Sequence, residues 1–259
     1  MDWGYTVSGL LVGVLVGLTG VGGGSLMTPL LVYVFGIAPV KAVGTDLLFA
    51  AITKSGGVWI HSRLKTIEWR IVGILAAGSV PASLLTTYLL QQIGVHNEQL
   101  NTIITTALGF ALILTSIALL FKGEFQQLGR RLSGQKLSAW KQWRWAVTIG
   151  AGIVLGVLVT LTSVGAGALG AAILFFLYPG LPTVRIVGTD IAHAVPLTAV
   201  AGLGHLHMGT VDFVLLGSLL LGSLPGIYLG SRLSHRVPEK VMRPILASML
   251  MLIGVKFVW

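Results

Sequence analysis

Four ionisable residues lie within otherwise apolar stretches of the sequence: Asp46, Lys54, Asp190 and His193. Inside a membrane such side chains are costly, so they usually pair with one another and mark substrate or ion pathways. Lys54 follows Asp46 by eight positions, about two helical turns, and His193 follows Asp190 by three, about one turn. Because each pair would share a helix face, the four residues are candidates for proton or cation coupling.

The two carboxylates also have a structural interpretation. Thr45–Asp46 and Thr189–Asp190 each precede an apolar run. Threonine and aspartate are common N-cap residues, and aspartate in a first turn suits the helix dipole. His193 has a comparable alternative as a hydrogen-bonded core histidine. Capping and coupling therefore stay open for the aspartates, and Thr45 and Thr189 are also predicted to contact a substrate.

Two glycine-rich interruptions precede these pairs, GVGGGS at 20–25 and SVGAG at 163–167. Glycine permits positive φ angles and close backbone approach. Irregular backbone at membrane depth persists only where it is buried in protein or lines a wet cavity, and free N–H groups beside a helix N-terminus favour anions. The substrate ligands predicted here are Thr19, Gly20, Gly22, Gly23, Gly24, Ser25, Thr162, Ser163, Gly165 and Gly167.

Helix packing is the alternative explanation for a glycine in an apolar segment. We prefer it for two runs with glycine at every fourth position, because small residues at this spacing let membrane helices approach closely. The runs are Gly9, Gly13, Gly17 and Gly222, Gly226, Gly230. The clustered glycines lack this spacing and are instead predicted to form turns that face a substrate.

Two basic residues stand at equivalent places before the aspartates, Lys41 and Arg185. They would either guide an anion to the two mouths of a path or contact lipid headgroups at the interface. The pair His205 and His207 is too small a set to predict a metal site. No serine is set beside a histidine base in a recognisable nucleophile motif, so neither an enzyme nor a cofactor is expected.

The composition indicates an integral membrane protein. The 259 residues are 54% hydrophobic and 10% charged, against about 25% charged in soluble domains, and the mean hydropathy is +0.90. No basic segment with aromatic residues stands clear of the apolar runs, so nucleic-acid binding is excluded. The chain has no cysteine, which excludes disulfides and thiolate chemistry. The N-terminus has no basic n-region, so the first apolar segment is expected to stay in the membrane.

The chain consists of two related halves. VGTDLLFAA at 43–51 resembles VGTDIAHAV at 187–195, an offset of 144 that becomes 143 upstream. The predicted units are a first repeat at 1–121, a polar cytoplasmic linker at 122–144 and a second repeat at 145–259. Each half has four apolar stretches, near 6–36, 43–60, 69–90 and 100–121, and near 145–178, 187–203, 211–231 and 241–259. Lys54 corresponds to Thr198, so its role is asymmetric.

The distribution of basic residues predicts opposite orientations of the two halves. Lysine and arginine gather at 63–70, 122–144 and 232–243 and are absent from 91–98 and 204–212. Basic loops favour the cytoplasmic side, and equivalent loops here have opposite bias. The pattern requires the first stretch of each half to enter and return, as a re-entrant hairpin or as two short spans, with both chain termini outside.

These residues resemble the TauE/SafE sulfite exporter family, also called the toluene-sulfonate uptake permease family. The resemblance rests on GLTGVGGGSLMTPLL at 17–31, GIAPVKAVGTDLLFAAITKSGG at 36–57 and a degenerate second copy at 160–194. It implies export or uptake of small sulfur or carbon oxyanions and organosulfonates. The family's shared core maps onto Gly20–Ser25, Lys41, Thr45 and Asp46, whereas Ser163, Ala166 and Thr198 depart from it in the second copy.

The sequence thus predicts an all-α membrane protein with two inverted-topology repeats, each a glycine-broken helical hairpin plus three transmembrane helices. Its predicted function is secondary transport of a small oxyanion, sulfite or an organosulfonate, coupled to protons, with alternating access at the repeat interface. A passive anion channel of the same architecture is the alternative. The expected partners are the anionic substrate and the lipid bilayer of the inner or plasma membrane, and a homodimer stays open.

Overall fold

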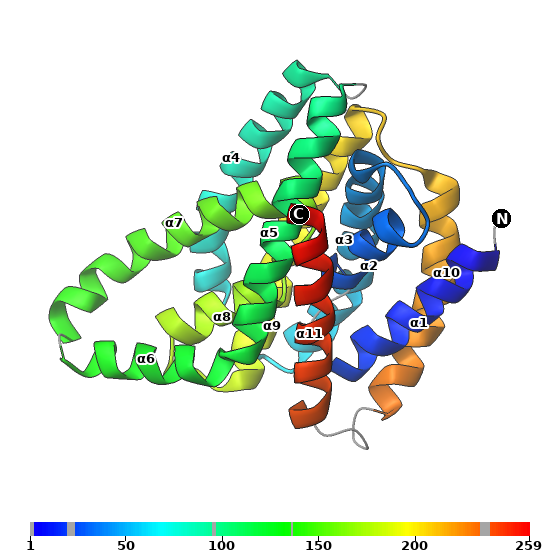
Figure 1. Cartoon of the computed structure of the whole chain (residues 1–259). Helices are drawn as coiled ribbons and strands as arrows, with labels where there is room; N and C mark the ends of the chain where they lie inside the picture. The colour runs from blue at the N-terminus through cyan, green and yellow to red at the C-terminus, as the bar shows by residue number, and fades with distance from the viewer. Residues whose placement is uncertain (1–2, 20–23, 95–96, 136, 234–238) are drawn as a thin grey trace.

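The computed structural model describes residues 3–19, 24–94, 97–135, 137–233 and 239–259, and every regular element within these ranges is an α-helix (Figure 1). In chain order the helices are α1 (Trp3–Thr19), α2 (Gly24–Tyr33), α3 (Pro39–Arg63), α4 (Trp69–Ile93), α5 (Glu98–Leu120), α6 (Lys122–Gln135), α7 (Leu137–Thr162), α8 (Ala168–Leu177), α9 (Thr183–His207), α10 (Phe213–Leu233) and α11 (Glu239–Val258). The segment 122–144, predicted as a polar linker, is occupied by α6 and the first turns of α7.

Among the described residues, six helices are long and apolar enough to cross a membrane: α4, α5, α9, α10, the 143–162 part of α7 and the 241–258 part of α11. Helix α3 has 25 residues, as many as α4 and α9, but is less apolar because it contains Lys41, Asp46 and Lys54. The all-helical membrane architecture predicted from composition is therefore confirmed at this level.

The first apolar stretch of each half folds as a helical hairpin. Tyr5 near the start of α1 packs against Phe35 just beyond α2, with ring centroids 5.0 Å apart. In the second half the hydroxyl groups of Thr148 in α7 and Tyr178 just beyond α8 lie 2.9 Å apart. The two contacts join positions related by the offset of 143 residues, so both stretches reverse direction in the same way.

The returning arms α2 and α8 are short. Each has 10 residues, about 15 Å of helix, whereas the hydrocarbon core is about 30 Å thick. These arms cannot cross a bilayer, which favours the re-entrant alternative over two short spans.

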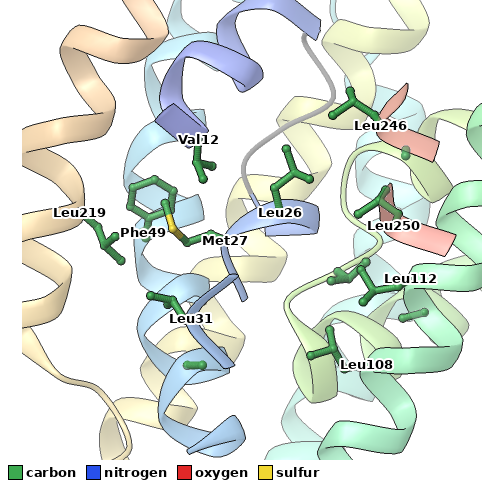
Figure 2. Packing of buried hydrophobic residues seen from close by; sticks show 14 of the residues in the cluster. Val12, Leu26, Met27, Leu31, Phe49, Leu108, Leu112, Leu219, Leu246 and Leu250 are labelled. Carbon is green, nitrogen blue, oxygen red and sulfur yellow. The ribbon is translucent and has the colours of Figure 1, made fainter. Parts of the chain in front are cut away.

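Both short arms are enclosed by other helices. Leu26, Met27 and Leu31 of α2 belong to a buried cluster that includes Phe49 of α3 and Leu219 of α10 (Figure 2). The second arm, α8, places Leu174 and Phe175 in a separate cluster with α4. Burial within protein is the condition under which a broken helix is tolerated at membrane depth.

Glycine determines how the hairpins pack on the neighbouring half. A Cβ at Gly13 of α1 would lie 2.5 Å from the Ser223 carbonyl oxygen of α10, and one at Gly226 would lie 2.4 Å from the Leu10 carbonyl oxygen of α1. Helix α1 therefore lies directly along α10, as Figure 1 shows. The packing role predicted for these glycine runs is confirmed. Helices α4 and α7 make the equivalent contact, with Gly78 against Ile149.

Candidate functional site

Asp46 is buried at the contact between α3 and α2. Its Oδ2 atom accepts a hydrogen bond of 2.5 Å from the hydroxyl of Thr28 in α2. The Ser163 side chain, from the break between α7 and α8, approaches the same carboxyl group. Asp46 Oδ1 and Ser163 Oγ are buried and have no hydrogen-bond partner within the described residues. The site thus retains polar atoms that can receive a ligand or a proton.

Lys54 connects the two halves. Two turns along α3 from Asp46, its ammonium group donates a hydrogen bond to the backbone carbonyl of Ala166, in the second glycine break. Lys54 is 8% exposed and interacts electrostatically with the carboxyl groups of both Asp46 and Asp190. Opposite charges and a carbonyl oxygen are the partners that a buried ammonium group needs.

Asp190 lies against the second returning arm. It is buried in α9, and its carboxyl group fills the space where a side chain at Gly170 of α8 would be. Its Oδ1 atom has no hydrogen-bond partner in the described part of the chain. Asp46 contacts α2 and Asp190 contacts α8, so each carboxylate meets the broken hairpin of its own half.

His193 is joined to α4. Its Nε2 atom lies 2.8 Å from the hydroxyl oxygen of Ser79, while its Nδ1 atom is buried without a partner among the described residues. One ring nitrogen therefore has the hydrogen bond expected of a core histidine, and the other remains free for a proton. Both interpretations made from the sequence are compatible with this geometry.

The second glycine break is a turn, as predicted. Ser163, Gly165 and Gly167 all have positive φ angles, of 59°, 118° and 150°, and α8 begins directly after them. Only glycine adopts such angles without strain, which explains two of these three positions. The Thr162 hydroxyl donates to the Leu158 carbonyl oxygen and accepts from the Val164 amide, and its predicted role as a substrate ligand stays a prediction.

The first glycine break lies mostly outside the described residues. Gly20, Gly22 and Gly23 are not among the residues that the structure describes. Thr19 ends α1 and Gly24 begins α2, and the Ser25 side chain next to it is buried. The role predicted for these residues in substrate binding stays a prediction.

The capping alternative for the two aspartates is wrong. Helix α3 begins at Pro39 after an N-cap at Ala38, and α9 begins at Thr183 after Pro182. Asp46 and Asp190 therefore stand about two turns inside their helices, where a carboxylate reaches no free N–H group of a helix end.

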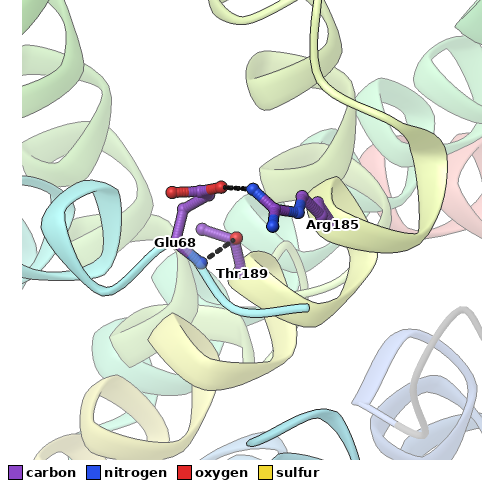
Figure 3. A network of polar contacts seen from close by, with 3 residues as sticks. All are labelled: Glu68, Arg185 and Thr189. Carbon is purple, nitrogen blue, oxygen red and sulfur yellow. Dashed lines mark hydrogen bonds and ion pairs between the residues drawn. The ribbon is translucent and has the colours of Figure 1, made fainter. Parts of the chain in front are cut away.

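Thr45 and Thr189 hold loops of the opposite half. The Thr45 hydroxyl accepts a 3.0 Å hydrogen bond from the amide of Asp212, and the Thr189 hydroxyl accepts one of the same length from the amide of Glu68. Figure 3 shows the second contact. The two bonds connect equivalent residues in exchanged order, and both donors lie at the starts of helices α10 and α4.

The predicted mouth residues differ in their pairing. Arg185 forms an ion pair with Glu68 (Figure 3), with side chains 45% and 30% exposed. Lys41 is exposed and lines a pocket together with Asp212, but the Asp212 Oδ1 atom accepts from the amides of Val214 and Leu215. Neither basic residue contacts the buried cluster around Lys54.

Two participating residues were missed from sequence, Thr28 and Ser79. Ser79 recurs as Ser223 in the second half, a repeated polar position inside an apolar helix that could have drawn attention to it. Thr28 follows the glycine-rich segment directly, within the block that carries the family resemblance. Neither signal distinguishes a site residue from a small polar residue that merely packs.

A helical membrane protein with broken hairpins and buried charges between its halves is of the membrane transporter class. The chain belongs to the Sulfite exporter TauE/SafE family, whose model matches residues 5–257. It is 42% identical over 258 residues to "Probable membrane transporter protein YjnA" of Bacillus subtilis, covering 100% of both chains. It is 28% identical to YdhB of the same organism, covering 93% of this chain and 96% of that one. No solved structure matches the chain significantly.

Proposed function

We propose that the protein is a secondary transporter for a small oxyanion, sulfite or an organosulfonate, and that the substrate binds between the glycine breaks near Lys54. The observation that carries this proposal is the hydrogen bond from Lys54 to Ala166, which brings a buried cation to the tip of the opposite hairpin. A cation beside the N-terminus of α8 is a favourable environment for a small anion. The family match supports the substrate class.

Proton coupling follows from the charges of the buried cluster. Lys54 contributes one positive charge, whereas Asp46 and Asp190 contribute two negative charges when both are ionised. An anion entering this cluster is repelled until a carboxylate takes up a proton, because like charges in a poorly solvated site disfavour each other. We therefore propose that substrate and proton bind together, with Asp46, Asp190 and His193 as the proton-accepting groups.

The two halves are proposed to be inverted repeats that alternate access to this site. The support is the exchanged hydrogen bonds of Thr45 with Asp212 and of Thr189 with Glu68, together with the opposite charge bias of equivalent loops. In this orientation both termini lie outside and loop 63–70 is cytoplasmic. The Glu68–Arg185 ion pair then closes the cytoplasmic junction, and its counterpart, Lys41 with Asp212, pairs when the outer junction closes.

The test is flux in proteoliposomes that contain the purified protein. Sulfite and a short organosulfonate are supplied outside, with and without an inward proton gradient, and uptake is followed with time. Saturable uptake that accumulates substrate against its gradient only when protons can follow supports the proposal. Non-saturable flux that never exceeds equilibrium indicates the passive channel, and absence of movement for all tested anions rejects the function.

A further inference from the structure

A cavity of about 580 Å³ lies outside the buried cluster, between the first turns of α4 and α7 and the loop from α8 to α9. The lining residues that could meet a ligand include Glu68, Arg70, Ile71, Ile74, Arg144 and Tyr178. We propose that this cavity binds the headgroup phosphate of an anionic phospholipid, a site independent of the transported substrate.

The charges of the cavity favour an anion. Of the described residues that line it, Glu68 alone is acidic, and its carboxylate is already paired with Arg185. Arg70 and Arg144 therefore leave a net positive charge in the cavity. Arginine is well suited to phosphate because its planar guanidinium group presents several donors in a fixed arrangement.

Arg144 is held in place before any ligand arrives. Its guanidinium group lies over the ring of Tyr178, 4.7 Å from the centroid. The Tyr178 hydroxyl is in turn 2.9 Å from the hydroxyl of Thr148. An arginine fixed by an aromatic ring loses less conformational freedom on binding than a free one.

The position of the cavity at the expected level of the membrane interface indicates a lipid as the source of the phosphate. Two candidate spans begin beside it, at Trp69 and Trp143, and the exposed side chains of Trp69, Trp143 and Trp145 are the type that gathers at membrane interfaces. Ile71 and Ile74, which follow Arg70 in α4, also line the cavity. Their apolar side chains suit the part of an acyl chain that lies next to the headgroup. A basic pocket between helices at an interface is a typical lipid headgroup site.

The test is native mass spectrometry of the full-length protein released from nanodiscs that contain equal amounts of phosphatidylglycerol and phosphatidylcholine. The comparison is between the wild type and Arg70→Gln/Arg144→Gln. The control is Arg63→Gln/Lys65→Gln, which removes the same charge from exposed positions of the neighbouring loop. Inorganic phosphate is added in a separate arm as a competitor.

The wild type and the control should retain phosphatidylglycerol in preference to phosphatidylcholine. In the cavity variant the ratio of bound phosphatidylglycerol to phosphatidylcholine should be about thirtyfold lower, as expected for the loss of two basic side chains near an anionic lipid. Arg70→Lys/Arg144→Lys should keep part of it. Equal losses in the control, or no preference in the wild type, would overturn the proposal. Displacement of the lipid by inorganic phosphate would assign the cavity to free anions and reject a lipid site.

Discussion

The junction of α3 with the start of α10 and the junction of α9 with the start of α4 are built from equivalent residues. In both, a threonine hydroxyl accepts a backbone N–H group from the opposite half, and in both a basic residue stands one turn earlier on the same helix. They differ in what the acidic residue does. Glu68 pairs with Arg185, whereas Asp212 caps its own helix and Lys41 has no ion pair within the described part of the chain.

Equivalent backbone contacts are thus combined with unequal side-chain charges. The hydrogen bonds made by backbone groups are the same at both junctions, so the halves are joined in the same way. Among the described residues, one junction has an ion pair that the other lacks. Lys54, which has Thr198 as its counterpart, is a second asymmetry inside the same framework.

The largest effect is expected from removing the asymmetric cation. Lys54→Met leaves two buried carboxylates without their positive partner, and breaking a buried ion cluster costs about 3–5 kcal/mol. Sulfite flux in proteoliposomes, normalised to monodisperse protein, should fall at least about a hundredfold. Lys65→Met, an exposed lysine, is the control. Flux within a few fold of wild type in Lys54→Met would remove Lys54 from the site.

A charge exchange tests the ion pair that distinguishes the junctions. Arg185→Glu places two acids together and should lower flux about fivefold, a size typical for an exposed pair. Adding Glu68→Arg restores the opposite charges and should recover flux. Lys41→Glu should also lower flux, because Lys41 is proposed to pair with Asp212 when the outer junction closes. Adding Asp212→Lys should recover less of the flux than the first exchange does, because Asp212 also accepts from the amides of Val214 and Leu215. Complete rescue by the second exchange would mean that the two junctions contribute equally.

The shared hydrogen bonds predict equal effects at the two ends. Thr45→Val and Thr189→Val keep the shape of the side chain and each remove an acceptor from a backbone N–H group, which costs about 1 kcal/mol. Thermal unfolding in detergent should therefore show the same decrease in midpoint for both. Thr198→Val is the control, because that hydroxyl bonds only within its own helix. Clearly unequal decreases would contradict the equivalence of the junctions.

The smallest expected effect separates capping from ion pairing. Asp212→Ala removes the acceptor for two amides at the start of α10 and should cost about 1 kcal/mol of stability. Glu68→Ala removes only a half-exposed ion pair and should cost about 0.5 kcal/mol. The same unfolding measurement compares them. A larger loss for Glu68→Ala would mean that the ion pair also supports the fold.

Much of the architecture could be predicted from the residues. The offset between Thr45 and Thr189 revealed two halves, and the four-residue glycine spacing identified the faces on which α1 and α10 meet. The starts of α3 and α9 were missed because their apolar stretches begin about one turn later than the helices do. Helix α3 begins at Pro39 and α9 directly after Pro182, and proline is common where a helix begins. Asp46 and Asp190 therefore lie too far inside their helices for the capping interpretation to hold.

The site itself was only partly predictable. Helical spacing brought Asp46 and Lys54 to one face, but it could not reveal that the ammonium group of Lys54 reaches Ala166, 112 residues away. That contact depends on how α3 and the second hairpin pack, which local periodicity does not encode. For the same reason periodicity could not reveal that the hydroxyls of Thr45 and Thr189 accept hydrogen bonds from backbone amides across the halves, and their predicted contact with a substrate stays a prediction.

The pairing of α1 with α10 has a consequence for biosynthesis. Helix α1 is translated well before α10, yet the surface that covers its glycine face belongs to α10 (Figure 1). Helix α1 therefore cannot bury this face against α10 until residues 213–233 have been translated. A chain truncated before α10 would leave the glycine face of α1 without the neighbour that covers it in the complete fold.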